Sequence, residues 1–571
     1  MINIKINNKA LEVEENITIL EACKQININI PTLCYLKDVN NSASCRICVV
    51  EVKGKANLVT SCSTKVEKDM EIFTNTDKVI NARKTNLELI LSQHNRDCEN
   101  CLKDSKCKLQ DLFEEYKTEE KYIKKDFKIK IDESPFLVRD ESKCILCNRC
   151  VEVCENIQSI AVIGKNKRGI NTNVGCAFDK KIKDVPCIAC GQCILVCPTG
   201  ALSEKDDTGE VFKALNNKDL YVIAITAPSV RVTLGEEFEY NYGTNVKYKM
   251  VSALKELGFK KVFDVNFGAD LTIMEEVEEF IYRMENNKNL PLITSCSIGW
   301  TNYLKYYNPK MIKHLSSCKS PQLMLGAIIK SYYAKKYKIN PKKMFVVSIM
   351  PCIAKKIENK MVNKTKKDVD AVITTRELAR MIKKQNIEFK KLKDEDFDNP
   401  IGKGASTIFG DSGGVTESVL RTYIEKTTNK TLDKLEFKNV RGLKGLKEAV
   451  YNIEGKEIRV GVVSGISNAK DILEKIENKT EKYHFIEIMG CPGGCINGGG
   501  QPFIDFDKYD KEEVLKLRAE ALYKDDLSLE VRKAHKNKDI ISIYKNFLKK
   551  PGSKKSKSLL HTTHKKLKKY K

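Results

Sequence analysis

The stretch CILCNRCVEVC at residues 144–154 returns as CIACGQCILVCP at residues 187–198, so the spacing C-x2-C-x2-C-x3-C occurs twice. A chance match of this length is very improbable. Thiolates are soft ligands that suit iron, and short C-x-x-C arrays in a large chain favour metal sites over structural thiols. The repeat therefore predicts two 4Fe–4S clusters and a compact fold around them.

This duplication resembles the run found in bacterial two-cluster ferredoxins. In that run the fourth cysteine binds the other cluster. The resemblance implies that one cluster is held by Cys144, Cys147, Cys150 and Cys197. The other is then held by Cys187, Cys190, Cys193 and Cys154.

A second cysteine group precedes the repeat, with the spacing C-x10-C-x2-C-x13-C: Cys34, Cys45, Cys48 and Cys62. It resembles the 2Fe–2S site of plant-type ferredoxins. Alternating strand patterns at 2–6, 49–52 and 58–60 surround it, as in a small β-grasp domain. A zinc site is the alternative, but zinc sites usually pair two C-x2-4-C knuckles.

A third group, in the pattern H-x3-C-x2-C-x5-C, follows a predicted helix at 79–94: His94, Cys98, Cys101 and Cys107. A lone histidine is more often a packed or surface residue than a ligand. Here it precedes three cysteines at ligand spacing, which favours a 4Fe–4S cluster with one imidazole ligand. Imidazole in place of a thiolate is expected to raise the potential of the cluster.

Composition sets wider limits. A chain of 571 residues is too long for one core, so several domains are expected. The N-terminus has no signal-peptide pattern, and no apolar run could cross a bilayer, so the cytoplasm is the expected location. The net charge of +24 counts every cysteine as neutral, and iron-bound thiolates would lower it. The tail 549–571 is predicted to be a solvated basic arm, with steering of an acidic partner left open.

The second half has a different pattern. Short apolar runs ending near Gly, Pro, Ser or Cys alternate with amphipathic segments, which predicts α/β layers with partly parallel sheets. The runs lie at 221–228, 261–267, 290–296, 344–352, 458–465 and 484–491. Three of them end at Cys296, Cys352 and Cys491. Because sites in such sheets lie beyond the carboxyl ends of strands, we expect one shared pocket.

Three segments here resemble the signature motifs of the FeFe (iron-only) hydrogenases: TSCSIGW (294–300), MPCIAKKIE (350–358) and EIMGCPGGCINGGG (487–500). The resemblance extends through APSVRVTLGEEF, FGADLTIMEE, LSSCKSPQ, DAVITTREL and FGDSGGV. The N-terminal cysteine groups are similar to those of the long clostridial-type enzymes. The resemblance thus covers nearly the whole chain and implies a two-lobed α/β hydrogenase domain.

In that family a 4Fe–4S cubane is joined through a cysteine to a two-iron subsite with CO, cyanide and a bridging dithiolate amine. The resemblance implies Cys352, Cys491 and Cys495 as cubane ligands, with Cys495 bridging to the subsite. It implies that Lys355 and Ser229 hydrogen-bond cyanide. Met350 and Met489 would line the subsite, although methionine is also an ordinary core residue.

Protons need a separate path. Cys296 matches the family's terminal relay thiol, and Ser316 matches a further member of the relay. Residues 272–284 read as a helix that places Glu276, Glu279 and Arg283 on one face. A solvated charged stripe is the plain alternative, and the motif correspondence favours the relay. Glu358 is a weaker second candidate.

The first motif departs from the family pattern T-S-C-C-P-x-W, because Ser297 and Ile298 replace cysteine and proline. The replaced cysteine is the fourth cubane ligand. Serine is a harder, more basic ligand, so a Ser297-ligated cubane would be weaker. Alternatively Cys296 becomes the ligand, or Cys318 supplies the donor. The outcome is an active enzyme, a slow or sensory hydrogenase, or a chain that has lost the chemistry.

The resulting prediction is a multidomain α+β and α/β ferredoxin hydrogenase that makes and oxidises H2. Its expected domains are a 2Fe–2S domain at 1–78, a histidine/cysteine-ligated 4Fe–4S domain at 79–125, a two-cluster domain at 126–208 and the catalytic domain at 209–571. Expected partners are ferredoxin or flavodoxin and the maturation enzymes of the two-iron subsite, with no nucleic acid, no membrane and a monomeric state. A Nar-like assembly protein and a subunit of an NADH-oxidising complex are disfavoured. No Gly-rich dinucleotide fingerprint follows a strand.

Overall fold

The structure is a computed structural model, and it describes all residues except 105, 120–129, 363–366, 402 and 570–571, and the side chains of 359–362. Most of the charged stretch 114–130, predicted to separate two cysteine groups, lies outside the described residues. The chain forms two compact units: 1–185 with 196–203, and 186–195 with 204–571. Residues 186–195, which carry three cysteines of the repeat, thus group with the second unit.

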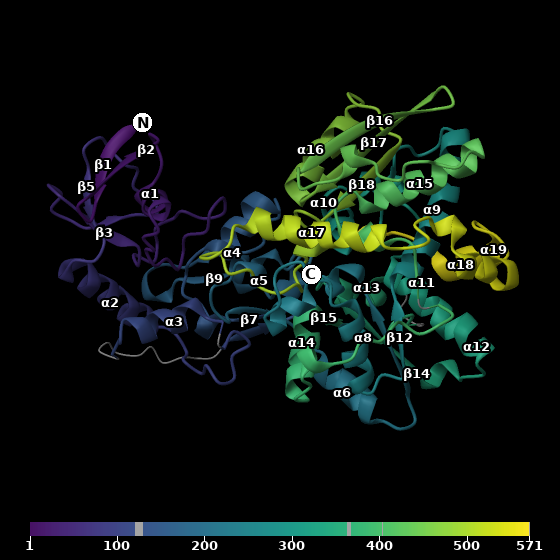
Figure 1. Cartoon of the computed structure of the whole chain (residues 1–571), viewed down its shortest axis with the longest axis horizontal. Coiled ribbons are helices and arrows are strands. Elements are labelled where there is room, and N and C mark those ends of the chain that lie inside the picture. The colour runs from purple at the N-terminus through teal and green to yellow at the C-terminus, as the bar shows by residue number, and fades with distance from the viewer. Residues whose placement is uncertain (105, 120–129, 363–366, 402, 570–571) are drawn as a thin grey trace. The chain divides into compact units, whose positions relative to one another are not determined.

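The first unit begins with a mixed five-stranded sheet in the order β2-β1-β5-β3-β4 (Figure 1). Its strands are β1 (Ile2–Ile6), β2 (Lys9–Val13), β3 (Val49–Val52), β4 (Val59–Thr60) and β5 (Glu71–Phe73). The helix α1 (Ile19–Gln25) packs with the sheet in one hydrophobic cluster. Thr18 and Glu21 form a capping box that fixes the start of α1. The alternating patterns in the sequence therefore predicted β1, β3 and β4 correctly, whereas β2 and β5 were not predicted.

Short elements complete the unit. The predicted helix near residue 79 is confirmed as α2 (Asp77–Leu91), and α3 (Lys108–Glu115) follows the cysteines near residue 100. One hairpin, β6 (Ile131–Glu133) with β7 (Leu137–Asp140), precedes the cysteine repeat, and another, β8 (Gly164–Asn166) with β9 (Asn173–Gly175), lies between its two halves. The single turns α4 (Arg149–Glu152) and, in the second unit, α5 (Gln192–Leu195) follow the first cysteines of each half.

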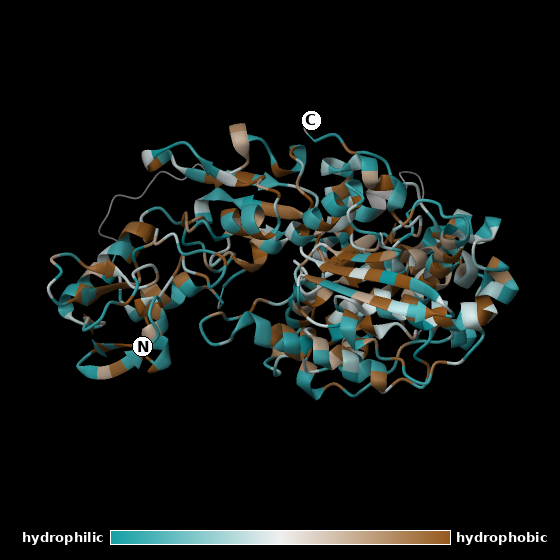
Figure 2. Ribbon diagram, turned by 90° about the horizontal axis from the view of Figure 1, so that it is seen from above, coloured by the Kyte–Doolittle hydropathy of each residue, from teal (hydrophilic) through white to brown (hydrophobic). Residues whose placement is uncertain are grey.

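Two sheets form the framework of the second unit. One is fully parallel, in the order β12-β11-β14-β15; the other, β13-β18-β17-β16, is parallel except for β16. Figure 2 shows that their strands carry mainly hydrophobic residues, as the short apolar runs predicted. The bounds are β11 (Tyr221–Thr226), β12 (Lys261–Asp264), β13 (Leu292–Ile293), β14 (Met344–Met350), β15 (Ala371–Thr374), β16 (Leu446–Ile453), β17 (Lys456–Ser464) and β18 (Phe485–Met489).

Helix α9 (Asn266–Glu285) joins the two cores of this unit. Phe267, Leu271 and Met274 belong to the core cluster of the fully parallel sheet. A second face, with Ile273, Phe280 and their neighbours, belongs to the core of the other sheet. A helix that is apolar on two faces is buried on both. Two carboxylates of the same helix, Glu275 and Glu276, are each 1% exposed.

The remaining helices of this unit cover the sheets (Figure 1). They are α6 (Thr208–Asn216), α7 (Pro228–Arg231), α8 (Lys247–Glu256), α10 (Ile298–Tyr307), α11 (Pro321–Ile328), α12 (Ala334–Lys336), α13 (Lys355–Val362), α14 (Thr375–Lys384), α15 (Gly414–Thr428), α16 (Ile466–Glu477), α17 (Lys511–Leu527), α18 (Lys538–Ile543) and α19 (Lys554–Leu560). In the described part of the chain, none of the helices has the length and apolar character needed to span a bilayer.

The C-terminal segment is folded, so the prediction of a solvated basic arm is wrong for residues 549–562. Ser556 and Leu560, four residues apart on α19, are fully buried, and Leu560 belongs to the parallel-sheet core. The backbone N–H of Lys319 donates to Leu560 O at 2.8 Å, and that of Thr562 to Ser317 O at 2.8 Å. The lysines of α19 lie on its exposed side. The many lysines in this segment concealed, at the level of sequence, that one side of α19 is buried.

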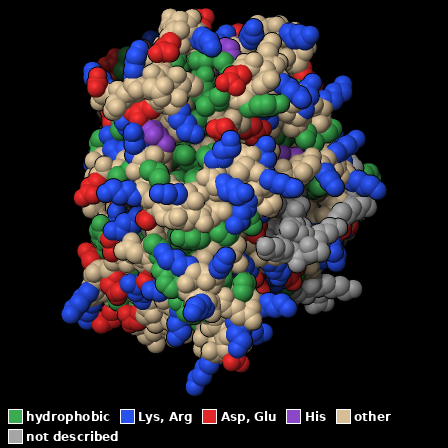
Figure 3. All heavy atoms as spheres, turned by 90° about the vertical axis from the view of Figure 1, so that its right-hand side faces the viewer, with side chains coloured by type: hydrophobic (Ala, Val, Ile, Leu, Met, Phe, Trp, Pro, Cys, Tyr) green, Lys and Arg blue, Asp and Glu red, His purple; other side chains and the backbone are tan. Residues whose placement is uncertain are grey.

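Basic side chains are instead spread widely. Figure 3 shows one face of the molecule with lysine and arginine scattered over it and acidic groups among them. Such interspersed charge favours solubility. This distribution of charge does not support steering of an acidic partner by the tail alone.

Replacing Leu560 by alanine is expected to destabilise the second unit by about 2–5 kcal/mol, because a fully buried leucine leaves a cavity. The melting temperature of the purified protein measures the effect. Lys557→Ala, at an exposed position on the same helix, is the matched control. Equal melting temperatures for the two variants would contradict the burial of this segment.

Candidate functional site

Three cysteines of the second half come together beyond the carboxyl ends of strands. Cys352 lies two residues after β14, and Cys491 two residues after β18. They lie deep in the unit, yet Cys352, Cys491 and Cys495 all keep partly accessible surface, so they border an internal space. Burial, followed by the neighbouring Cys352 thiol, raises the pKa of both Cys491 and Cys495. The raised pKa favours the protonated thiol. Metal binding reverses this preference, because a coordinating thiol is deprotonated.

The backbone around these thiols is shaped by glycine. Gly493 and Gly494 have φ angles of 79° and 87°, which disfavour any side chain. A Cβ on Gly494 would lie 2.8 Å from the backbone nitrogen of Ser412. The CPGGC turn is thus packed against the FGDSGGV segment (409–415) with no room for a larger residue.

Ser229 and Lys355 lie at positions suited to an anionic group. Ser229 is fully buried, and its Oγ has no hydrogen-bond partner in the described structure. Lys355 Nζ donates to Cys296 O at 2.9 Å and pairs with Glu358 at 3.1 Å. A buried orphan hydroxyl and a buried ammonium fit a bound anion-bearing cofactor, as do three convergent thiols.

Cys296 and Ser297 are neighbours in the loop of the first motif, but their side chains have different surroundings. Ser297 Oγ accepts a hydrogen bond from the backbone N–H of Gly490, next to Cys491, at 3.0 Å. The Cys296 thiol, whose pKa burial and then Glu276 raise, also has Lys355 and Cys495 nearby. Cys318 is buried in the parallel-sheet core, beside Glu276, Glu279 and Glu275.

The charged face of α9 is buried. Glu276 is 1% exposed, and its Oε2 has no hydrogen-bond partner in the described structure. Burial raises its pKa to about 8, against a hydrogen bond with Ser316 that lowers it. A carboxyl with this pKa is mostly protonated near neutral pH. This burial excludes the solvated stripe that spacing alone would favour.

Glu279 and Arg283 continue this face toward solvent. Glu279 Oε1 lies 2.5 Å from Arg283, and its Oε2 accepts from Ser317 Oγ at 2.7 Å. Arg283 also donates to the backbone carbonyls of Asn289, His314 and Leu315. Arg283 is therefore anchored, and it holds Glu279 in one orientation.

Several residues at the site were not identified from the sequence. Glu487, fully buried, accepts from the backbone N–H groups of Gly413 and Thr416, both at 2.8 Å. It stands two residues before Met489 in an otherwise apolar strand, and its partners lie far away in the sequence. Gln322 donates to Glu358 at 2.6 Å. Met350 and Met489, which the resemblance did imply, are buried at the ends of their strands.

One segment of the cysteine repeat packs directly on this site within the second unit. A Cβ on Gly499 would lie 2.5 Å from Cys190 O, and one on Gly191 would lie 2.9 Å from Gly499 Cα. Gln192 donates to Asn497 O at 2.8 Å. Cys190 is also close enough to raise the pKa of Cys491, after burial and Cys352. Cys190 thus lies next to the chain segment that follows the CPGGC turn.

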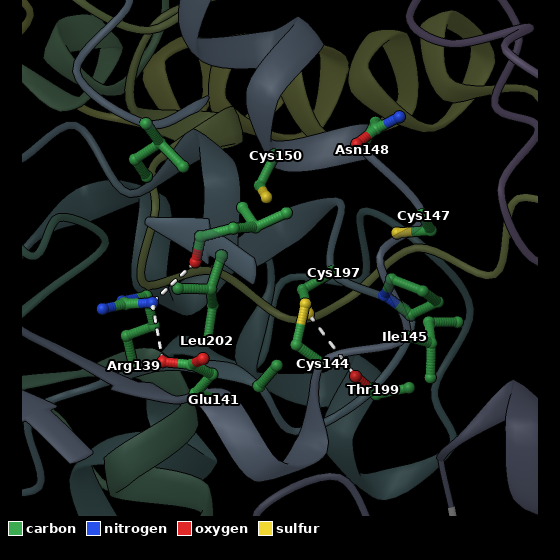
Figure 4. Close-up of a pocket in the computed structure, with 14 residues that line it drawn as sticks. Arg139, Glu141, Cys144, Ile145, Cys147, Asn148, Cys150, Cys197, Thr199 and Leu202 are labelled. Carbon is green, nitrogen blue, oxygen red and sulfur yellow. Dashed lines mark hydrogen bonds and ion pairs between the residues drawn. The ribbon is translucent and has the colours of Figure 1, made fainter. Parts of the chain in front are cut away.

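In the first unit, Cys144, Cys147, Cys150 and Cys197 line one apolar cavity (Figure 4). Cys197 follows Cys150 by more than forty positions in the sequence, and the fold brings it to the first three. Their sulfur atoms face the same space (Figure 4). These four residues are the ones that the resemblance implies as one ligand set. Cys154, the remaining member of the first run, is buried in the same unit.

The two N-terminal sites are also assembled within the first unit. Cys48 Sγ lies 3.3 Å from Cys62 Sγ, and Cys34 is hydrogen-bonded to Cys45, which lowers the pKa of Cys34 to about 5. Burial lowers the pKa of His94 to about 4, so the imidazole is neutral and can bind a metal. Its Nδ1 has no hydrogen-bond partner in the described structure. Cys98 and Cys107 each have Cys101 as a charged neighbour.

Comparisons with known proteins agree with this arrangement. Residues 220–499 match the family "Iron only hydrogenase large subunit, C-terminal domain", and 512–567 match "Iron hydrogenase small subunit". Residues 1–77, 83–121 and 143–201 match a 2Fe-2S cluster binding domain, an NADH-ubiquinone oxidoreductase-G iron-sulfur binding region and a 4Fe-4S dicluster domain.

Curated relatives match along the whole chain. The chain is 46% identical to the NADP-reducing hydrogenase subunit HndD of Solidesulfovibrio fructosivorans, with 98% of each chain covered. It is 41% identical to iron hydrogenase 1 of Clostridium pasteurianum over 99% of this chain and 100% of that one. A solved structure of a variant of apo [FeFe]-hydrogenase HydA1 from Chlamydomonas reinhardtii superposes with a TM-score of 0.57 at 35% identity, covering 63% of this chain and 98% of that one. The chain belongs to the iron-only (FeFe) hydrogenases.

Proposed function

We propose that this chain reduces protons to H2 and oxidises H2 at a site bordered by Cys352, Cys491 and Cys495, with electrons passing through its iron–sulfur centres. The observation that carries the proposal is the meeting of three thiols, with Cys296 lying near both Cys495 and a buried, protonatable carboxyl on α9. The bound hydrogenase cofactor, a cubane joined to a two-iron subsite, would supply the redox-active iron. The three thiols, the Ser229 hydroxyl, which has no hydrogen-bond partner in the described structure, and the glycines of the CPGGC turn fit such a group.

The side chains around it have separate tasks. Cys352, Cys491 and Cys495 would hold the cubane, with Cys495 shared with the two-iron subsite. Lys355 and Ser229 would donate hydrogen bonds to cyanide in a site shielded from water, which fixes orientation. Glu358 and Cys296 O hold the Lys355 ammonium in place. Met350 and Met489 would close the pocket with apolar, adaptable side chains.

Protons would move along Cys296, Glu276, Ser316, Glu279 and Arg283. Glu276 lies next to Cys296 and is hydrogen-bonded to Ser316, and its raised pKa allows it both to hold and to release a proton near neutral pH. Arg283 holds Glu279 in its orientation toward the serine segment. Glu358, paired with Lys355 and Gln322, remains the weaker second candidate.

Ser297 would occupy the place of the fourth cubane ligand. Its contact with Gly490, beside Cys491, supports the unshifted loop, with Cys296 left to face Glu276. We expect Ser297→Cys to hold the cubane more firmly, because thiolate is the better ligand for iron. Iron loss to a chelator measures this, with Ser295→Cys on the same loop as the control. Unchanged iron retention in Ser297→Cys would contradict the assignment.

Electrons would reach the site through one 2Fe–2S and three accessory 4Fe–4S clusters. The ligands would be Cys34, Cys45, Cys48 and Cys62; His94, Cys98, Cys101 and Cys107; and the two crossed sets of the repeat. The contact of Gly191 with Gly499 supports transfer from the Cys190 cluster to the catalytic site. Ferredoxin or flavodoxin is the proposed external partner, in the cytoplasm, with maturation enzymes building the two-iron subsite. The name of the HndD relative makes a pyridine-nucleotide-linked complex the alternative route.

A slow or sensory hydrogenase is the second candidate, because Ser297 weakens the ligand set. A Nar-type assembly factor fits less well: protein NAR1 of Arabidopsis thaliana is 30% identical and covers 67% of this chain. The relatives named hydrogenases match the chain almost completely, including its N-terminal cysteine groups.

Infrared spectroscopy of the anaerobically matured protein tests the proposal. We expect CO and cyanide stretches together with H2 evolution from reduced ferredoxin or viologen. Stretches with very slow turnover would favour the sensory candidate. A fully reconstituted chain with iron only in the N-terminal centres would contradict the proposal.

A further inference from the structure

Three different metal-binding side chains meet near the outer end of the proposed relay: Glu279, Cys318 and His561. One ligand atom from each lies within 4.8 Å of the others. They come from α9, from the segment before α11, and from the residue after α19. Glu279 and His561 are 16% and 10% exposed, so the group is reached from solvent. A carboxylate, a thiol and an imidazole together form a typical donor set for zinc.

The surroundings of His561 also match a metal ligand. Its Nε2 lies 2.9 Å from Glu275 Oε2, which leaves Nδ1 facing Ser317 Oγ at 2.7 Å. Metal-binding histidines usually donate their other ring N–H to a carboxylate, which fixes the tautomer and the ring. Glu275 is itself fully buried and held by Tyr544 at 2.6 Å and by the N–H of Gly552 at 2.8 Å. The ring therefore has the second partner that a metal site needs.

The local charge favours a cation. Glu275 lies beside His561, and Glu279 is itself a carboxylate of the group, while Arg283 is the cation paired with Glu279. Ser317 Oγ now bridges Glu279 and His561 at 2.7 Å to each. An ion that replaced this bridge would be coordinated by the three donors, which now lie within 4.8 Å of one another, once they close around it.

We propose that Glu279, Cys318 and His561 form a binding site for a thiophilic divalent cation of the zinc class, and that its occupation stops proton transfer through Glu279. This inference rests on the proposed function, since it assigns an inhibitory role to a site on that relay. On binding, the Cys318 thiol gives its proton to solvent, a zinc–sulfur bond forms, and nothing is oxidised or reduced. The Glu279 carboxylate is then held by the metal and cannot exchange protons.

The test uses the anaerobic protein with its iron–sulfur centres loaded, incubated with ZnCl2 and desalted. We expect a single retained zinc with unchanged iron content. Zinc K-edge X-ray absorption should show one sulfur at about 2.3 Å beside nitrogen and oxygen ligands. Cys318→Ser and His561→Gln, made separately, should each lose the zinc. Glu275→Gln should weaken zinc binding by about 10- to 100-fold.

His535→Gln is the matched control. His535 also pairs with a carboxylate, Glu425, at 2.8 Å, but the three-ligand group does not include it. Zinc content should be unchanged in this variant. In the wild type and His535→Gln, zinc should lower H2 turnover by about 100-fold, while His561→Gln should keep its own zinc-free rate in the presence of zinc.

The outcomes separate the two proposals. Zinc retained equally by Cys318→Ser and His561→Gln would overturn the site. Zinc bound as expected but without loss of turnover would overturn the inhibitory role. Zinc bound by a matured chain that makes no H2 would support the site and instead contradict the proposed function.

Discussion

Glu276→Gln is expected to lower H2 turnover by about 100- to 10,000-fold, the range for loss of a positioned proton-transfer group. Glutamine keeps the shape of the side chain and can still hydrogen-bond Ser316, but it cannot exchange a proton. Glu276 is buried between Cys296 and Ser316, so a water chain is poorly placed to replace it. Turnover with reduced viologen, at equal infrared cofactor bands, measures the effect.

Glu278→Gln is the control on the same helix, since this exposed carboxylate only pairs with Lys426 at 3.7 Å. We expect it to leave turnover unchanged. Wild-type rates in Glu276→Gln would show that protons take another path, and Glu358 would then become the first candidate.

The same carboxyl gives a pH dependence of stability. Burial raises the pKa of Glu276 from 4.5 to about 8, so between these values the folded chain holds a proton that the unfolded chain has lost. Its contribution is therefore fully present below the lower value and is lost as the pH rises through the higher one. Between about pH 5 and pH 8 the melting temperature of wild type should fall more than that of Glu276→Gln. Equal slopes would contradict the raised pKa.

Cys491→Ala is expected to abolish turnover and Cys296→Ala to lower it, for different reasons. Cys491 lies with Cys352 and Cys495, so its loss should remove iron from the catalytic site. Cys296 faces Glu276 and Lys355, so its loss should keep the iron and lower turnover by about 100-fold or more. Iron content and cubane electron paramagnetic resonance separate the two effects.

Cys176→Ala, a buried cysteine of the first unit outside every predicted ligand set, is the control. It should keep both iron and turnover. If Cys296→Ala lost iron while Ser297→Ala kept it, the first-motif loop would be shifted by one residue, and Cys296 would be the cubane ligand.

Local patterns predicted much of the fold. The apolar runs at 221–228, 344–352 and 484–491 became β11, β14 and β18, because buried parallel strands need apolar residues on both faces. The helix at 272–284 was recognised within α9, and cysteine spacing located every N-terminal group. The strand β16 was missed, because only alternate positions along it are buried.

Most of the wrong predictions concerned which residues are buried. The tail was read by its charge, whereas Ser556 and Leu560 fix α19 into the core. Spacing could not distinguish an exposed from a buried charged face on α9, since that depends on the two sheets that cover its other faces. Glu487 and His561 lie far in sequence from the residues they meet, so no local pattern identified them.

The sequence by itself indicated the chemistry: which thiols and imidazole are candidate iron ligands, and which motifs belong to a hydrogenase. Ligand spacing is a local property, and it survives in the order of residues. Only the tertiary structure decided that Ser297 contacts Gly490 while Cys296 faces Glu276, and that the C-terminal segment closes over Glu275 and Glu279. These contacts join residues distant along the chain, and packing of the two sheets about α9 sets them.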